Sequence, residues 1–408
     1  MKTDVLTGDK AEPIWAPLRH SLFRSLWMAN TVSNLGTWMQ GMGAAWLMAQ
    51  LSQSTQMVAL VQAAVTLPVF LFVVPAGILA DRTNRASFLL VTHAIMALGA
   101  LGLGIVISSG QVTPSILLLG TFLIGSGAAL TMPAWQAAVS TLVEPQQIHN
   151  AAALNGMSFN FARTLGPTAA GFIAQAAGVA AIFWINAVSF FGMIFVFWRW
   201  KAEGGFTTKE QAKAPNAASS FVFGSILRHN AFRSLLLRTF ICFFGASSMW
   251  SLLPAFAAIN LNMKASEVGL LMGTIGAGAV LGGVLIPNAK ARLGINHLIG
   301  LASLQLGLAL IFTAWNGVPG IIWLSMVLTG IGWAFIVSGL NGTAQIMFPK
   351  EIRARAISTY LMAMYGGTTS GSFFWGSLSS QTGVNTTFLI AGALMIISPI
   401  LGLRWRVQ

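Results

Sequence analysis

The chain has 408 residues, of which 55% are hydrophobic and only 8% are charged. Soluble globular domains carry roughly a quarter charged residues, so this composition excludes an ordinary soluble protein and predicts an integral membrane protein. The formal net charge of +13 would favour nucleic acid as a partner of a soluble protein, but the placement of the basic residues along the chain argues against nucleic acid and for a lipid bilayer.

The chain begins with a mixed, polar segment. Residues 1–23 lack the basic start, short apolar core and small-residue cleavage site of a signal peptide, so we expect a cytoplasmic tail. The single cysteine, Cys242, excludes a disulfide within the chain. The five histidines show no His-x-x-x-His spacing, and we therefore expect neither a metal site nor a cofactor.

Twelve apolar runs follow, each close to or above the roughly 20 residues that cross a bilayer as a helix. They lack the alternation over about ten residues that a membrane β-barrel requires. The sequence therefore predicts an all-α membrane protein with twelve transmembrane helices, at residues 24–50, 56–80, 86–108, 114–140, 151–176, 180–199, 232–259, 266–288, 295–315, 319–346, 356–379 and 385–404.

The basic residues fix the expected orientation. If the amino terminus lies inside, the inner segments hold 19 of the 22 Lys and Arg residues. Lys264 alone falls in an outer loop, while Arg163 and Arg238 fall within spans. Inner loops of membrane proteins are enriched in Lys and Arg, so both termini are predicted to be cytoplasmic.

The chain is also predicted to be a repeat of two six-helix bundles. Residues 18–26 recur as residues 227–235, an offset of 209, and paired glycines recur at an offset of 205, as in Gly166 and Gly371. The expected divisions are an amino-terminal bundle at 24–199, a cytoplasmic linker at 200–231, a carboxy-terminal bundle at 232–404 and a cytoplasmic end at 405–408. In transporters built from such repeats the binding site lies between the halves near the midplane.

A charged loop joins the second and third runs, with the sequence Gly77-Ile78-Leu79-Ala80-Asp81-Arg82-Thr83-Asn84-Arg85. Asn84 is expected at a positive φ in a tight turn. The spacing resembles the signature loop of the major facilitator superfamily, in which Gly77, Asp81, Arg82 and Arg85 would form a gating loop that locks the inner helix ends in the outward-open state. A loop that serves only as a charged anchor is the alternative.

Arg163 is the main candidate for substrate binding. It lies about 18 Å into the fifth run, counted from Ala151 at 1.5 Å per residue. A charge at that depth costs roughly 2.5–3.5 kcal/mol on insertion scales, so it usually faces a wet cavity or a partner. We expect it to bind an anionic or carbonyl-rich group; a structural arginine bonded to neighbouring helices is the alternative.

Gly166, Pro167 and Gly171 follow Arg163 and suit close helix packing. They also resemble the fifth-helix motif of exporting antiporters in the superfamily, with alanines in place of two glycines. The fourth run lacks the arginine and glutamine that proton-coupled drug exporters carry there. No Asp or Glu lies deep within a predicted span, so proton coupling would have to use Asp81, His93, the substrate itself or charge repulsion at Arg163.

Other polar residues are candidates for the cavity lining. Asn30, Asn34 and Trp38 share a face of the first run. Gln136 and Asn341 correspond at the offset of 205, and Tyr365 lies at a depth similar to that of Arg163. Hydrogen bonding between helices is an equally good explanation of the asparagines in the first run.

Residues 143–155 extend the resemblance to the bacterial enterobactin-exporter and drug-efflux branch of the superfamily. The resemblance implies a monomeric, proton-coupled exporter of a small siderophore-like or drug-like molecule in the bacterial inner membrane. Uptake or facilitated diffusion of an anionic metabolite anchored by Arg163 is the alternative. The sequence contains no His-Glu-x-x-His, Gly-x-Ser-x-Gly or phosphate-loop pattern, so we do not expect an enzyme.

Overall fold

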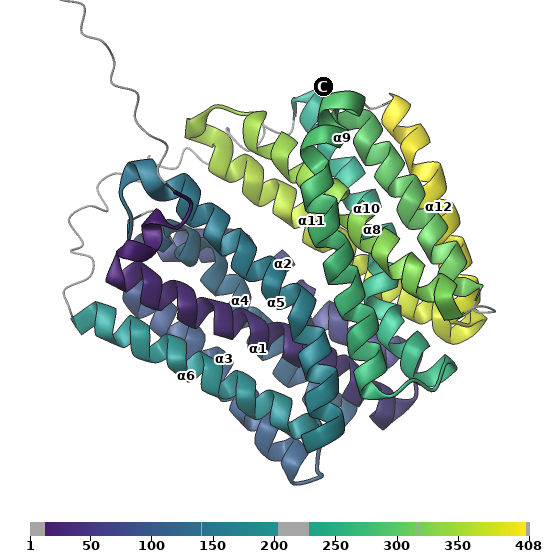
Figure 1. Cartoon of the computed structure of the whole chain (residues 1–408), viewed down its shortest axis with the longest axis horizontal. Helices are drawn as coiled ribbons and strands as arrows, with labels where there is room; N and C mark the ends of the chain where they lie inside the picture. Colours follow the sequence, from purple (N-terminus) through teal and green to yellow (C-terminus); the bar gives the residue numbers. More distant parts are fainter. Residues whose placement is uncertain (1–12, 140, 203–227, 316–318, 405–408) are drawn as a thin grey trace, which may run out of the picture.

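A computed structural model describes residues 13–139, 141–202, 228–315 and 319–404. These residues form helices and connecting turns with no β-strand among them (Figure 1). The α-helices are α1 (Ser21–Ser52), α2 (Thr55–Arg82), α3 (Arg85–Ser108), α4 (Pro114–Val139), α5 (Ile148–Ala177), α6 (Val179–Ala202), α8 (Asn230–Ala255), α9 (Ala265–Ala314), α10 (Pro319–Ile346), α11 (Lys350–Thr382) and α12 (Val384–Arg404).

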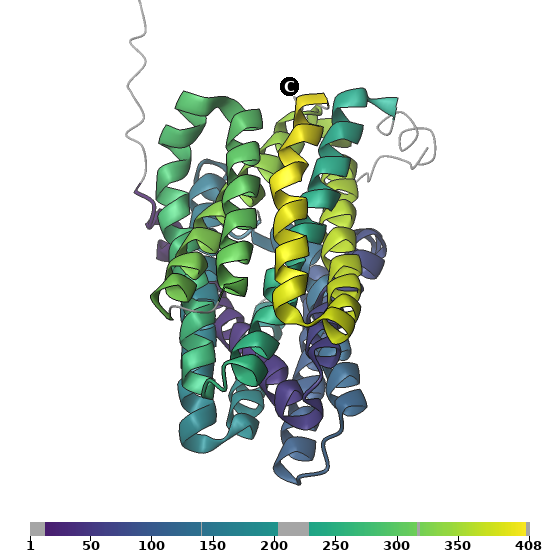
Figure 2. The ribbon, with the colours of Figure 1, turned by 90° about the vertical axis from the view of Figure 1, so that its right-hand side faces the viewer.

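The predicted spans all correspond to helices, and the all-α membrane fold of twelve spans is confirmed. The seventh run continues from α8 into a short π-helix, Phe256–Asn260. The eighth and ninth runs are joined in α9, which breaks at Gly294, where φ is +69°. Glycine adopts this left-handed conformation without steric penalty, so the chain can reverse there without a separate loop. Figure 2 shows the carboxy-terminal helices from the side.

Local sequence explains several helix ends. The Asn84 side chain caps α3 by accepting a hydrogen bond from the Ser87 backbone N–H at 3.0 Å. Its φ is −64°, so the expectation of a positive φ at Asn84 is wrong: the residue acts as a helix cap and not as a tight-turn residue. Gly178 and Gly383, with φ of +82° and +83°, end α5 and α11 at equivalent positions of the repeat.

Helices α1–α6 pack mainly on one another, and so do α8–α12, which gives two bundles side by side (Figure 1). The internal repeat is visible in the contacts. Gly166 of α5 lies against the Leu35 carbonyl and Trp38 of α1, while Gly371 of α11 lies against the Phe244 carbonyl and Ser247 of α8. Leu35 and Phe244 are 209 residues apart, and so are Trp38 and Ser247. Both bundles therefore use the same packing.

Apolarity differs among the helices. Seven helices of the described part are long and apolar enough to cross a membrane by length and composition alone. The long helices α1, α5 and α11 are not among them, and α12 contributes only a shorter apolar stretch, Val384–Ile400. Each of α1, α5 and α11 contacts the opposite bundle, as do the more apolar helices α2 and α9.

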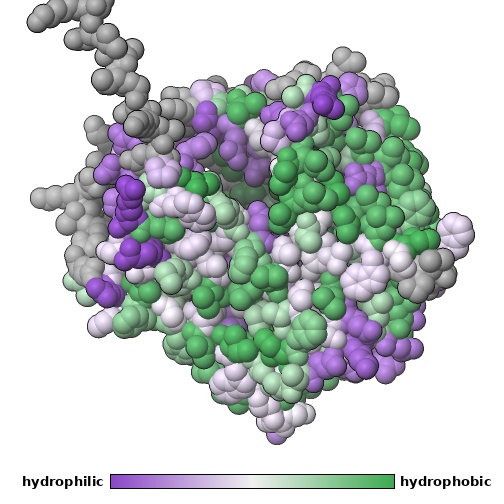
Figure 3. Space-filling model, in the orientation of Figure 1, coloured by the Kyte–Doolittle hydropathy of each residue, from purple (hydrophilic) through white to green (hydrophobic). Residues whose placement is uncertain are grey.

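The two bundles diverge toward one end of the molecule. Figure 3 shows the surface hollowed between them, toward the end at which α12 finishes. The same end holds the start of α5, the end of α6 with Arg199 and Lys201, and the start of α11 with Arg353 and Arg355. We call this end the basic end and the hollow the crevice.

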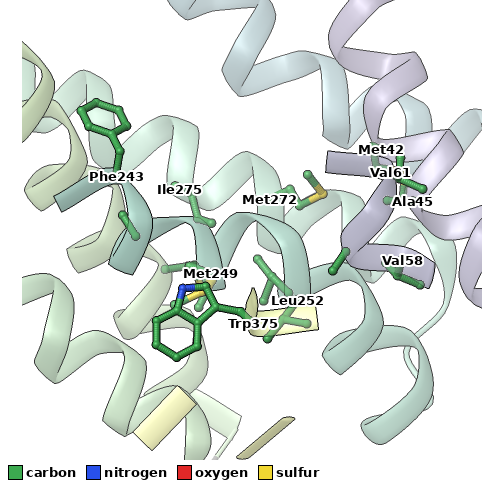
Figure 4. Close-up of a cluster of buried hydrophobic side chains, with 14 of the residues drawn as sticks. Met42, Ala45, Val58, Val61, Phe243, Met249, Leu252, Met272, Ile275 and Trp375 are labelled. Carbon is green, nitrogen blue, oxygen red and sulfur yellow. The ribbon is translucent and has the colours of Figure 1, made fainter. Parts of the chain in front are cut away.

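At the opposite end two contacts between the bundles close the crevice, and we call this the sealed end. Along the first, α5 meets α9: the Thr168 hydroxyl donates to the Gly269 carbonyl at 3.3 Å. Along the second, α2 meets α11: the Ser379 hydroxyl donates to Thr55 Oγ1 at 2.8 Å. Buried apolar side chains from α1, α2, α8, α9 and α11 fill the space at this end (Figure 4), so the seal combines close helix contacts with a dry core.

Candidate functional site

Arg163 is deeply buried in α5. Its side chain is 8% exposed. The Nε and Nη2 atoms are buried and have no hydrogen-bond partner among the described residues. A guanidinium offers five N–H donors and no acceptor, and leaving a buried charged donor unpaired costs roughly 1–3 kcal/mol or more. Nε and Nη2 therefore do not make the hydrogen bonds to carbonyls or asparagines of neighbouring helices that a structural arginine would make.

Two tryptophans of the opposite bundle flank the guanidinium. The Arg163 Cζ atom lies 5.1 Å from the ring centroid of Trp250 in α8 and 5.6 Å from that of Trp333 in α10. Both distances fall within the range of cation–π attraction, which contributes about 2 kcal/mol when the pair is desolvated. The indoles hold the charge in place without using its N–H donors, which remain able to bind another group.

Arg163 lies where the seal between the bundles ends. The next residue, Thr164, begins the contact with α9, and that contact continues to Gly171, whose missing side chain admits the Ala265 backbone. In the other direction α5 becomes uncovered, with Phe159 and Phe161 about half exposed. Arg163 thus lies, buried, where α5 passes from the closed part of the interface to its uncovered part.

Trp38 is the predicted lining residue that contacts the helix of Arg163. Its ring meets Phe159 of α5 edge-on at 5.7 Å between centroids, and its Cβ lies against Gly166. Asn30 and Asn34 lie on the preceding turns of α1 and are half-buried. The three residues therefore follow α1 from its contact with α5 toward the basic end.

The other three predicted lining residues lie away from the Arg163 side chain: Gln136, Asn341 and Tyr365. Gln136 is exposed near the end of α4. Asn341 is eight residues, about 12 Å, along α10 from Trp333, and its Oδ1 accepts a hydrogen bond from Gln345 at 3.0 Å. Tyr365 packs with Val69, Val73 and Ala129 in a cluster of both bundles. None of these three has a described contact with the Arg163 side chain.

The charged segment after α2 is mostly helical. Gly77, Asp81 and Arg82 lie in the last turns of α2, and the side chains of Asp81 and Arg82 are outside the described part of the structure. A side chain at Gly77 would meet open space. Arg85 donates from Nη1 to the Ala137 carbonyl of α4 at 3.3 Å, a contact within the amino-terminal bundle. The locking role of this segment remains a prediction.

The glycine–proline segment of α5 makes contacts on two sides. Gly166 faces α1, as described above, whereas Gly171 faces α9 of the opposite bundle. Pro167 lies inside α5, and its carbonyl lies close to Gly269. The segment therefore joins its own bundle and the opposite bundle through neighbouring turns of one helix.

Trp250 and Trp333 were not predicted as site residues, since 14 tryptophans in a membrane protein are mostly interfacial or packing residues. One of them, Trp333, could have been found by comparing its depth along α10 with the depth of Arg163 along α5. Arg163 lies 14 residues before the end of α5, and Trp333 lies 14 residues after the start of α10, at the same sealed end. Equal depth across a helical interface indicates a possible contact, but only the three-dimensional packing selects the faces.

Two helical bundles related by a repeat, with a crevice between them, define a membrane transporter of the major facilitator fold. The chain belongs to the transmembrane secretion effector family of this superfamily, which matches residues 12–408.

Relatives with full-length similarity are transporters. The chain is 23% identical over 400 residues to the enterobactin exporter EntS of Salmonella typhimurium, covering 94% of this chain and 91% of that protein. It is 21% identical over 370 residues to the staphyloferrin A transporter of Staphylococcus aureus, covering 88% and 89%. The crystal structure of a point mutant of the nucleoside transporter NupG superposes with a TM-score of 0.77 at 15% identity, covering 94% of this chain and 100% of that chain.

Proposed function

We propose that the protein exports a small organic molecule, siderophore-like or amphipathic, from the cytoplasm across the bacterial inner membrane. The observation that carries this proposal is the buried guanidinium of Arg163, with two nitrogen atoms, Nε and Nη2, that have no hydrogen-bond partner among the described residues, and with two indole rings beside it. Charge-assisted hydrogen bonds are roughly twice as strong as neutral ones. The site therefore favours a substrate with an anionic or carbonyl oxygen next to an apolar or aromatic body.

Direction and mechanism follow from the two ends of the molecule. With the basic end in the cytoplasm, as the distribution of Lys and Arg indicates, the crevice is open to the cytoplasm and the sealed end faces outward. A substrate enters from inside and reaches Arg163, after which the bundles rock, close the basic end and part along the α5–α9 and α2–α11 contacts. The name of one of the two siderophore-related relatives, the enterobactin exporter, supports export.

The test is transport into everted inner-membrane vesicles, with a panel of catecholate and carboxylate siderophores as probes. We expect accumulation of at least one of them, loss of accumulation after a protonophore, and loss in Arg163→Gln. Accumulation that ignores every ion gradient would contradict coupled export. Uptake of small organic anions into right-side-out vesicles that depends on Arg163 would instead establish the alternative, in which the protein imports an anionic metabolite.

Coupling to protons requires a group that titrates in reach of water. His93 is 3% exposed, its Nδ1 lies 2.9 Å from the Leu89 carbonyl, and its ring meets Phe190 and Phe197 edge-on inside the amino-terminal bundle. Asp81 lies in the last turn of α2 near the basic end and is therefore the better candidate. Asp81→Asn should abolish proton-driven accumulation while substrate binding persists; His93→Gln is the matched comparison, and the reverse result would assign coupling to His93.

A further inference from the structure

A separate pocket lies between α2, α8 and α11. Its volume is about 540 Å³, within the range of roughly 300–1,000 Å³ that is typical of small-ligand sites. One bundle contributes α2 and the other contributes α8 and α11. The lining residues are mostly apolar: Leu67, Phe70, Leu236, Phe240, Thr359, Met362, Ala363, Gly366, Thr369, Ser370 and Phe373.

The pocket faces away from the crevice. Thr368 of α11 is the repeat equivalent of Arg163, so it marks the face of α11 that corresponds to the Arg163 face of α5. The pocket residues Gly366 and Ser370 are each two residues from Thr368. Two residues turn an α-helix by about 200°, so both lie on the opposite face of α11. The rings of Phe240 and Phe373 are 39% and 46% exposed. In a membrane protein such surface meets lipid tails, which are as apolar as leucine.

The hydroxyl groups in the pocket lining already donate hydrogen bonds to other groups of the protein. Thr359 donates to the Arg355 carbonyl at 2.9 Å, Ser370 to the Gly366 carbonyl at 2.7 Å, and Thr369 to Thr66 Oγ1 at 2.9 Å. The lining therefore presents hydrocarbon and no charged group to an occupant. Its residues on α11 run from Thr359 to Phe373, about 21 Å of helix, a shape that suits an extended acyl chain.

Two arginines lie next to the pocket, on the side of the basic end. Arg233 is three residues before Leu236 on α8, and Arg355 is four residues before Thr359 on α11. Residues three or four apart share a helix face, so both guanidinium groups belong to the same faces as the pocket. Arginine binds phosphate through paired N–H donors, and anionic lipids of the inner leaflet are attracted to such basic helix ends.

We propose that this pocket binds one acyl chain of an anionic phospholipid, with the lipid phosphate held by Arg233 and Arg355. Most of the pocket lies on the basic side of the Thr66–Thr369 contact between α2 and α11 of opposite bundles. A chain bound there keeps the bundles apart at the basic end. The lipid therefore stabilises the conformation with the open crevice, a consequence that rests on the alternating-access mechanism proposed above.

Native mass spectrometry of the full-length protein, released from bilayers of equal phosphatidylglycerol and phosphatidylcholine, tests the binding. We expect preferential retention of phosphatidylglycerol, at least fivefold lower retention in R233Q/R355Q, and unchanged retention in K290Q/R292Q, which removes two exposed charges of the basic end outside the pocket. Ala363→Trp, which fills the pocket, should remove both lipids from it. Excess inorganic phosphate should not compete, because the acyl chain supplies part of the affinity.

Equal retention of the two lipids, or equal loss in the two double variants, overturns the assignment of the phosphate site. Undiminished lipid retention in a folded Ala363→Trp protein overturns the assignment of the pocket. For the conformational effect, spin labels at Thr55→Cys and Ser379→Cys should lie closer together in phosphatidylglycerol than in phosphatidylcholine, and no difference would refute it. These readouts need no transport, so they stand or fail independently of the export activity.

Discussion

Arg163 and Arg238 are both buried arginines within membrane helices, and their surroundings differ. The Arg238 side chain, 5% exposed, donates from Nη1 to Asn296 Oδ1 at 2.6 Å and from Nη2 to the Asn296 carbonyl at 3.5 Å. These contacts lie within the carboxy-terminal bundle and hold the α9 segment that follows the Gly294 break. The Nε and Nη2 atoms of Arg163 have no hydrogen-bond partner in the part of the chain that the structure describes, and the guanidinium lies against two indole rings of the opposite bundle.

The difference teaches how to separate structural from functional charge in this protein. A buried charge that is bonded within one bundle stabilises that bundle in every conformation. A buried charge with free donors at the boundary between bundles is destabilising unless a substrate or water binds it.

Arg163→Gln should lower transport roughly 10- to 100-fold, because hydrogen bonds to a charged group contribute about 1.5–3 kcal/mol and 1.4 kcal/mol is a factor of ten. Its melting temperature should stay close to that of the wild type, since no protein hydrogen bond from Nε or Nη2 is lost and removal of an unpaired buried charge offsets the lost cation–π contacts. Vesicle transport and thermal denaturation in detergent measure the two effects. A strong loss of stability would place Arg163 in the same class as Arg238.

Arg238→Met should show the opposite pattern. Loss of the bonds to Asn296 should destabilise the protein by about 1.5–3 kcal/mol, seen as a lower melting temperature. Transport, normalised to the amount of folded protein, should change less than twofold. If normalised transport falls as far as in Arg163→Gln, the distinction between the two arginines is wrong.

Gly171→Ala should weaken the sealed end, because the added Cβ would collide with the Ala265 carbonyl oxygen. Overpacking of this kind costs about 1–3 kcal/mol, enough to shift a two-state equilibrium several-fold toward the conformation in which the seal is open. Labelling of Thr55→Cys by an impermeant reagent should rise accordingly. Gly192→Ala is the control, since a side chain there meets open space; equal labelling in the two variants would contradict the prediction.

Trp333→Phe should have the smallest effect, about two- to fivefold on substrate affinity, because the smaller ring keeps a weaker cation–π contact and only part of the about 2 kcal/mol of a desolvated contact is lost. Trp323→Phe on the same helix is a matched control, as Trp323 packs in the hydrophobic core and has no described contact with Arg163. Binding measured by tryptophan fluorescence or by transport competition distinguishes them. A larger effect at Trp323 would show that the helix, and not the cage around Arg163, is being perturbed.

The fold was predictable because membrane helices and repeats leave strong local signals. Uninterrupted apolar runs gave the spans, and the glycine offset of 205 gave the two bundles, whose equivalent glycines meet equivalent partners. The direct junction of two spans at Gly294 was not predicted, since residues 288–293 are polar enough to suggest a loop. Asn84 was misassigned because asparagine favours both helix caps and left-handed turns.

The site was only partly predictable. Arg163 stood out because a charge at mid-membrane is rare, whereas Trp250 and Trp333 are two of 14 tryptophans with no distinguishing neighbours in sequence. Which indole meets which charge depends on the rotation of three helices in two bundles, which a single sequence does not encode locally. The same holds for the pocket beside α11, whose lining comes from segments up to 306 residues apart.

The α5–α9 contact has a consequence for the energetics of turnover. Its members are the carbonyls of Thr164, Pro167 and Ala265, facing glycines. Each carbonyl has two lone pairs and readily accepts a hydrogen bond from water. Separation of these helices therefore exposes carbonyl oxygens that water can hydrate, and it leaves no charged group of this contact unpaired. In the alternating-access cycle proposed above, the sealed end would therefore open and close again with hydration replacing the helix contact, and the rate of opening should depend on how readily water enters.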